Sequence, residues 1–116
     1  MPPGLQRLMV AAELRRERDL ALVKRIDAEA RALDAEARAL RTARPDAAEL
    51  LAMRGEAARL VASWDDLRAL RLSALGRRQA ALAAAREAAR ADLARSAGRI
   101  AAVGKLAERK GRGQAS

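Results

Sequence analysis

Residues 27–33 read Asp-Ala-Glu-Ala-Arg-Ala-Leu, and residues 34–40 repeat the same seven residues in the same order. A seven-residue period places recurring apolar residues on one side of a helix, which is the pattern of a coiled coil. Alternating spacings of four and three extend this apolar stripe, here called the seam, in both directions. Its members are Leu5, Met9, Ala12, Arg16, Asp19, Val23, Ile26, Ala30, Leu33, Ala37 and Leu40. The repeat predicts a coiled-coil helix over residues 5–43; the alternative is an amphipathic helix of a compact bundle.

The composition favours helix along the whole chain. The 116 residues include a single aromatic, Trp64, and the hydrophobic fraction of 51% comes mainly from alanine and leucine. Alanine, leucine, arginine and glutamate lose little side-chain entropy in a helix, whereas the residues that favour strands are scarce. Because bulky side chains are few, we expect a thin, long core. We interpret Trp64 as a packing residue of the seam; the alternative is a surface anchor for a partner.

Proline marks the boundary between two predicted helices. Pro45 disfavours helical geometry at the residue before it and lacks the amide that a continuing helix needs. Asp46 and Glu49 have the spacing of a capping box at the start of a new helix. We therefore expect a turn over residues 44–46 and a second helix over residues 46–109. The alternative is a single helix that is kinked at Pro45.

The second helix also carries a seam, and this seam changes phase. Its first part is Leu50, Met53, Ala57, Leu60, Trp64 and Leu67. Its second part is Leu72, Leu75, Gln79, Leu82, Arg86, Ala89, Leu93, Ser96, Ile100, Val103 and Ala107. The discontinuity and the nearby Gly76 predict a bend over residues 68–77. The predicted fold is all-α, an antiparallel two-helix coiled-coil hairpin with a longer second helix, and residues 1–4 and 110–116 are expected to be disordered.

Several classes of function are disfavoured by residue types that the chain lacks. Without cysteine or histidine there is no disulfide, no thiolate or imidazole metal ligand, and no side chain that ordinarily titrates near neutral pH. The carboxylates are spread among arginines on helical surfaces. We therefore expect no enzymatic activity, no cofactor and no metal site. Charges recur too often for a membrane span of ~20 apolar residues, and residues 1–4 do not resemble a signal peptide, so we expect a cytoplasmic protein.

The net charge of +9 is concentrated near the C-terminus, where residues 93–116 hold six Lys and Arg against one Asp or Glu. A basic end of this kind attracts acidic surfaces. Folding the first helix back on the second is expected to leave the last ~25 residues unpaired; alternatively, residues 5–14 reach part of this overhang. Its apolar stripe has cationic flanks, which favours binding of a partner. The predicted contacts are Arg95, Arg99, Ile100, Val103, Lys105, Leu106, Arg109 and Lys110.

A family resemblance rests on the second half of the chain. The pattern begins with Trp64, Arg68, Arg71 and Ala74-Leu75, and it ends with Arg95-Ser96-Ala97-Gly98-Arg99 and Lys105-Leu106-Ala107-Glu108-Arg109. It resembles short FliJ-like proteins, the stalk family of flagellar and type III secretion export systems. The resemblance implies an antiparallel coiled coil whose terminal end enters a hexameric export ATPase. Its other parts are implied to contact the export gate or escort chaperones, peripheral to a membrane export apparatus.

Three functions follow as hypotheses. The first is a non-enzymatic coiled-coil adaptor, an export-stalk component that binds an export ATPase. The second is a basic helical protein that binds nucleic acid non-specifically through phosphates, without a sequence-reading module or aromatic stacking platform. The third is a structural coiled coil that associates with itself.

Overall fold

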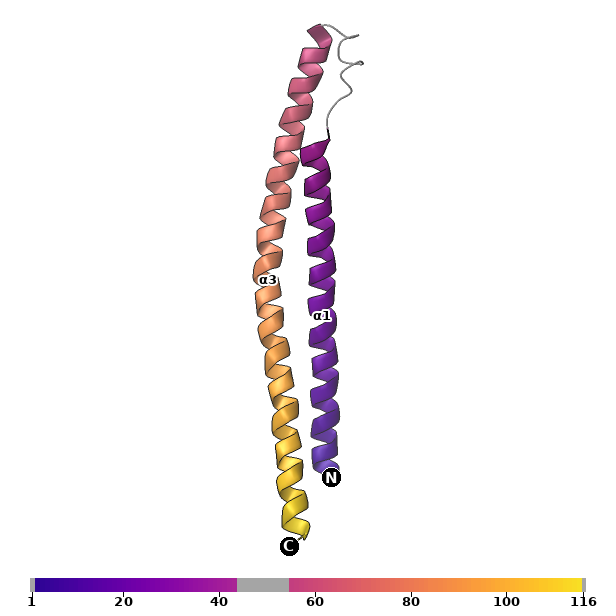
Figure 1. The fold of residues 1–116 in the computed structure, drawn as a ribbon, viewed down its shortest axis with the longest axis vertical. Coiled ribbons are helices and arrows are strands. Elements are labelled where there is room, and N and C mark those ends of the chain that lie inside the picture. Colours follow the sequence, from indigo (N-terminus) through magenta and orange to yellow (C-terminus); the bar gives the residue numbers. More distant parts are fainter. Residues whose placement is uncertain (1, 44–54, 116) are drawn as a thin grey trace. The chain divides into compact units, whose positions relative to one another are not determined.

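The computed structural model describes residues 2–43 and 55–115, which form two helices and no strand. Helix α1 spans Pro3–Thr42 with 40 residues, and α3 spans Gly55–Ala115 with 61 residues (Figure 1). The predicted all-α fold with a longer second helix is confirmed. The predicted turn, the capping pair and the start of the second helix lie outside the described residues, as do the seam positions Leu50 and Met53.

The chain divides into two compact units, and each helix contributes a segment to both. The terminal unit consists of Met1–Asp27 and Ala84–Ser116, and the central unit consists of Ala28–Ala83. Each is described by itself below.

The two segments of the central unit run antiparallel. Arg71 Nε donates to Glu36 Oε1 at 2.8 Å, and Arg78 Nε donates to Glu29 Oε1 at 3.1 Å. Residue numbers thus rise along α3 while they fall along α1. In antiparallel coiled coils such charged pairs flank the packed apolar residues and help to choose the pairing. The carboxylates and guanidinium groups are about half exposed, so each pair contributes little stability, about 0.2–1 kcal/mol.

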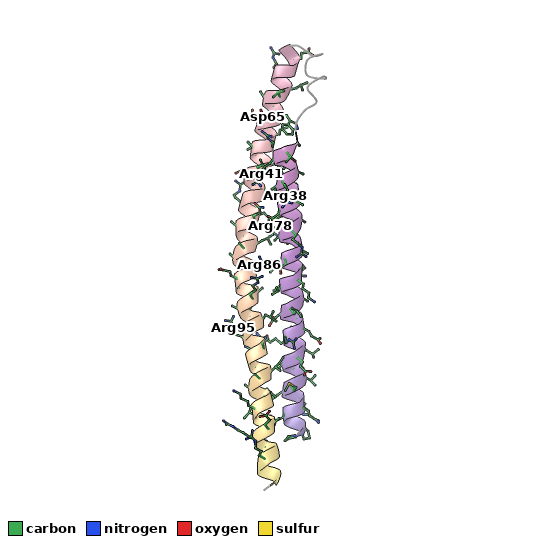
Figure 2. All side chains as sticks on the ribbon, in the orientation of Figure 1. Arg38, Arg41, Asp65, Arg78, Arg86 and Arg95 are labelled. Carbon is green, nitrogen blue, oxygen red and sulfur yellow. The ribbon has the colours of Figure 1, made fainter. Side chains whose placement is uncertain are left out.

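The terminal unit has the same antiparallel direction. Arg86 Nε lies 2.7 Å from Asp27 Oδ1, and the Ser96 hydroxyl donates to the Asp19 carboxylate. The Arg86 N–H does not point at the oxygen, so that contact is an ion pair and not an aligned hydrogen bond. Figure 2 shows Arg86 on the side of α3 that faces α1. The hairpin pairing is therefore antiparallel in both units.

The predicted seam forms the core of both units. On α1 every predicted member is buried or half-buried except Arg16, which is exposed. On α3 every member from Leu72 to Ala107 is buried or half-buried. The side chains that lose most of their exposure are Leu5, Val23, Ile26, Ala37, Leu75, Leu82, Ala89 and Ser96. Full burial of a leucine or isoleucine side chain contributes about 1.5–3 kcal/mol, so these few large residues dominate the packing energy.

Three polar members of the α3 seam, Gln79, Arg86 and Ser96, each meet an aspartate of α1. Besides the Arg86 and Ser96 contacts, Gln79 Nε2 donates to Asp34 Oδ1 at 2.6 Å in the central unit. A polar group in a coiled-coil core costs stability but helps to select one pairing of the helices, because most other pairings leave it without a partner. These contacts therefore determine which residues of α1 lie opposite which residues of α3 more sharply than the apolar seam does.

The first part of the α3 seam differs from the prediction. Leu60 and Leu67 are 50% and 66% exposed, so their predicted seam positions are wrong, whereas Trp64 and Arg68 are half-buried. Towards the start of α3, the seam runs from Leu72 to Arg68 and then to Trp64, in two steps of four residues. Arg68 therefore takes the seam position that was predicted one residue earlier. The Arg68 guanidinium lies 4.8 Å from the centre of the Trp64 ring, a cation–π contact.

Both helices extend further towards the termini than predicted. The prediction of disorder is wrong for residues 3–4, because proline suits the first turn of a helix and the Gln6 amide donates to the Pro2 carbonyl at 3.0 Å. It is also wrong for residues 110–115, which continue α3. Each glycine there costs about 1 kcal/mol. Arg112 pairs with Glu108 at 3.4 Å, and cations near a helix C-terminus interact favourably with the helix dipole. Helix α3 is unbroken through residues 68–77, where the bend stays a prediction.

Candidate partner-binding surface

The terminal unit carries most of the positive charge. It holds fourteen Lys and Arg against seven Asp and Glu, a net charge of +7, whereas the central unit holds ten against eight, a net charge of +2. The unit that includes both ends of the chain is thus the basic one (Figure 1). A local excess of this size attracts acidic partners over roughly the ~8 Å screening length at physiological salt.

The five cations that were predicted to contact a partner are all exposed on α3. Arg95 pairs with Asp92 one turn earlier, and Figure 2 shows it on the side of α3 away from α1. Within residues 2–43 and 55–115 the other four make no ion pair. They are Arg99, Lys105, Arg109 and Lys110.

The predicted unpaired overhang is wrong. Ile100 and Val103 are half-buried, and the contact of Asp19 with Ser96 brings the first turns of α1 beside the last turns of α3. The prediction counted helix pairing from residue 46, but the observed contacts place Glu36, six residues before the end of α1, beside Arg71. Pairing therefore begins later along α3. The alternative that residues 5–14 reach this part of α3 is confirmed, and Leu106 stays 45% exposed.

The two helices of the terminal unit enclose a shallow groove of about 360 Å³. It is lined on α1 by Leu8, Ala11, Ala12 and Arg15, and on α3 by Arg99, Ala102 and Val103. Both sets follow the spacings i, i+3, i+4 and i+7 of one helical face when Leu106 is added to the α3 set. The groove is mainly apolar, and an arginine lies at one end of each set.

Sequence reasoning missed the α1 side of this groove, although a signal was present. Leu8, Val10 and Leu14 are apolar but lie outside the seam, and they are 54%, 56% and 57% exposed. A helix segment with apolar residues on several faces has more apolar surface than a single packing partner can cover. Leu8 lines the groove, whereas Val10 and Leu14 line a separate hollow on α1, so only part of this apolar excess belongs to the groove.

No catalytic arrangement emerges from the described part of the chain. Residues 2–43 and 55–115 contain no group of three acidic side chains that could hold a metal ion. The helices that the structure describes include no stretch that is long and apolar enough to span a bilayer. What the terminal unit offers chemically is a basic, partly apolar surface suited to binding. Comparison of the chain with protein-family models, with curated proteins and with solved structures gives no match.

Proposed function

We propose that this protein is a non-enzymatic helical-hairpin adaptor that binds an acidic surface of another protein through its terminal unit. The observation that carries the proposal is the concentration of unpaired exposed cations on the last turns of α3, in a unit with a net charge of +7. Within residues 2–43 and 55–115 these cations form no ion pair, so their charge is available to a partner.

The specific form of the proposal is an export-stalk component. The FliJ-like pattern of the second half implies a partner, the hexameric export ATPase of flagellar and type III secretion systems, and an export gate as a further contact. An antiparallel hairpin with a basic end fits such a stalk. The protein would then act in the cytoplasm, at the periphery of a membrane export apparatus.

The test is binding of the purified chain to the purified export ATPase of the same cell. One variant replaces Arg99, Lys105, Arg109 and Lys110 with glutamate. The matched control makes the same charge change on exposed arginines of the central unit that form no ion pair with any residue the structure describes. These are Arg31, Arg38, Arg41 and Arg59.

We expect the parent and the control to bind the ATPase and the terminal-unit variant to lose binding. Equal loss in both variants would show that only net charge matters, and absence of binding by the parent would refute the ATPase as partner. Binding measured at two salt concentrations separates the electrostatic contribution to affinity from the apolar one, because only the electrostatic contribution falls steeply as salt is added.

Non-specific nucleic-acid binding is the second candidate, and the +7 charge of the terminal unit favours it. Neutralisation of phosphates by lysine and arginine makes such binding strongly salt-dependent, with log K falling by about 0.9 per contacted phosphate for each unit of log salt. Titration of random duplex DNA at several salt concentrations decides between the candidates. Useful affinity at physiological salt supports this one, and negligible affinity there excludes it.

A further inference from the structure

We propose that the groove of the terminal unit receives a third helix, supplied by the protein partner, whose apolar stripe ends in acidic residues that pair with Arg15 and Arg99. This inference rests on the proposed function in one respect, that the partner is a protein. It goes further by naming the surface, the secondary structure of the bound segment and the placement of its charges.

The two arginines line the same end of the groove, one from each helix. Arg15 lies four residues before Asp19, and Arg99 lies three residues after Ser96, the residue that Asp19 contacts. In an antiparallel pair these steps lead to the same level along the helices. Both arginines line the same groove, which agrees with this placement.

Neither guanidinium group has a counter-ion in the part of the chain that the structure describes. The nearest acidic residues on the same helical faces, Asp19 four residues from Arg15 and Asp92 seven residues from Arg99, are already engaged, because Asp19 accepts the Ser96 hydroxyl and Asp92 pairs with Arg95. Two cations placed opposite each other repel, and a carboxylate between them would turn this repulsion into two attractions. Arginine forks also bind carboxylates through paired N–H donors. The arginine end of the groove is therefore complementary to acidic side chains.

The remainder of the groove suits the apolar face of a helix. Its floor consists of Ala11, Ala12, Ala102 and Val103, small side chains over which another helix can pack closely. Seven residues from each arginine, away from the arginine end, lie Leu8 and Leu106, which are 54% and 45% exposed. A helix docked in a groove contacts it through residues at i, i+3, i+4 and i+7. The complementary segment thus has apolar residues at these spacings and acidic residues at the end near the arginines.

Charge also argues against other occupants. A second copy bound through this face would place two units of net charge +7 side by side, and like-charge contacts oppose association. Nucleic acid would meet the arginines but gain nothing from an alanine and valine floor, which offers no aromatic side chain for base stacking. An acidic amphipathic helix uses both the charged end and the apolar floor.

The test uses the full chain and three labelled helical peptides. The first has apolar residues at i, i+3, i+4 and i+7 followed by two glutamates. The second has lysines in place of these glutamates, and the third has the first peptide's composition in an order without the apolar stripe. The protein variants are R15E/R99E and the control R25E/R90E, which changes the net charge equally at exposed sites of the same unit outside the groove. Far-UV circular dichroism checks that each variant is folded.

We expect the parent and R25E/R90E to bind the glutamate peptide at least about tenfold more tightly than the lysine peptide, since two attractive charge contacts replace two repulsive ones. R15E/R99E should reverse this preference, a result that a misfolded variant cannot give. The peptide without a stripe should bind at least about tenfold more weakly. Equal binding of the glutamate peptide to all proteins, or of all peptides to the parent, would overturn the proposal.

Other occupants have their own readouts. If sedimentation shows a dimer that R15E/R99E disrupts and R25E/R90E does not, the groove binds a second copy of the chain. Binding of phosphatidylserine vesicles or duplex DNA without binding of the glutamate peptide would assign it to lipid or nucleic acid. Either result overturns the helix proposal.

If the export ATPase binds the chain but R15E/R99E binds it as well as the parent, the groove inference fails and the adaptor proposal stands. If the glutamate peptide binds as expected but the ATPase does not, the groove inference stands and the ATPase is refuted as the partner.

Discussion

Leu75 and Leu67 both lie in the part of α3 that belongs to the central unit, eight residues apart. Their environments differ sharply. Leu75 is 2% exposed in the seam, whereas Leu67 is 66% exposed. Leucine-to-alanine replacement at each site therefore removes the same atoms from two different surroundings. The pair of variants tests directly which residues of α3 face α1.

The expected losses follow from burial. Leucine exceeds alanine by three carbons, and burial of each contributes about 0.8 kcal/mol. Leu75→Ala should therefore lower the free energy of unfolding by about 2.4 kcal/mol, close to the low end of measured core truncations because solvent lies near a two-helix core. Leu67 is about one-third buried, so its truncation should cost about 0.8 kcal/mol, less a few tenths regained from the higher helix propensity of alanine.

The assay is urea and thermal unfolding followed by far-UV circular dichroism. With about 100 helical residues, an unfolding entropy of about 0.2 kcal/mol/K converts these losses into Tm decreases of about 12 °C for Leu75→Ala and about 3 °C for Leu67→Ala. The control is the dependence of the free energy on urea, which should be unchanged if the unfolded state is unaffected. Equal losses at the two sites, or a larger loss at Leu67, would refute the seam assignment of α3.

Three further predictions concern the terminal unit. Arg99→Glu should raise the unfolding free energy by about 0.5–1 kcal/mol at low salt, because it replaces repulsion from Arg15 with attraction, and the gain should vanish in concentrated salt; a loss of stability at low salt would contradict the facing arrangement. Ser96→Ala should cost about 1–2 kcal/mol in urea unfolding, because the half-buried Asp19 carboxylate loses its hydroxyl donor; no loss would mean that water replaces this hydroxyl. Gly111→Ala should favour local helix by about 1 kcal/mol and slow amide exchange over residues 110–115; unchanged exchange would argue against helix in that segment.

The fold and most of the core could be predicted from the sequence because the heptad period is local information. Leu75, Leu82 and Ala89 were identified from spacing alone, and all three are buried. At the phase change the spacing rule no longer decides, because steps of three and of four are both compatible with a helical stripe. The choice that included Leu67 was wrong, since the seam passes through Arg68 instead.

Which residues of the two helices lie opposite each other could not be predicted in the same way. It depends on contacts between distant residues, such as Asp19 with Ser96, and the spacing within one helix carries no information about them. Because the predicted alignment of the helices was wrong, it implied an unpaired overhang and did not reveal the α1 side of the groove. Arg99 was correctly placed on the exposed surface, but its opposite residue, Arg15, belongs to a helix that the prediction had not brought alongside.

The aspartates that meet polar residues of α3 have a mechanical consequence. Since residues 27–33 and 34–40 are identical, sliding α3 by one heptad along this part of α1 presents it with the same apolar stripe, and the apolar energy changes little. The polar contacts remove this equivalence. In one direction, Gln79 would meet another aspartate, but Arg86 would lie beside Leu20 and Ser96 beside Ala12.

The opposite slip keeps the contact of Arg86 with an aspartate and breaks the other two. Either displacement thus sacrifices two polar contacts, and one of them is in each case the contact of the buried Ser96 with Asp19, whose loss costs about 1–3 kcal/mol. A force that pulls one helix lengthwise past the other must supply this energy before the first new stable position is reached. A repetitive helix pair that would otherwise shear easily under axial load is in this way held at one length.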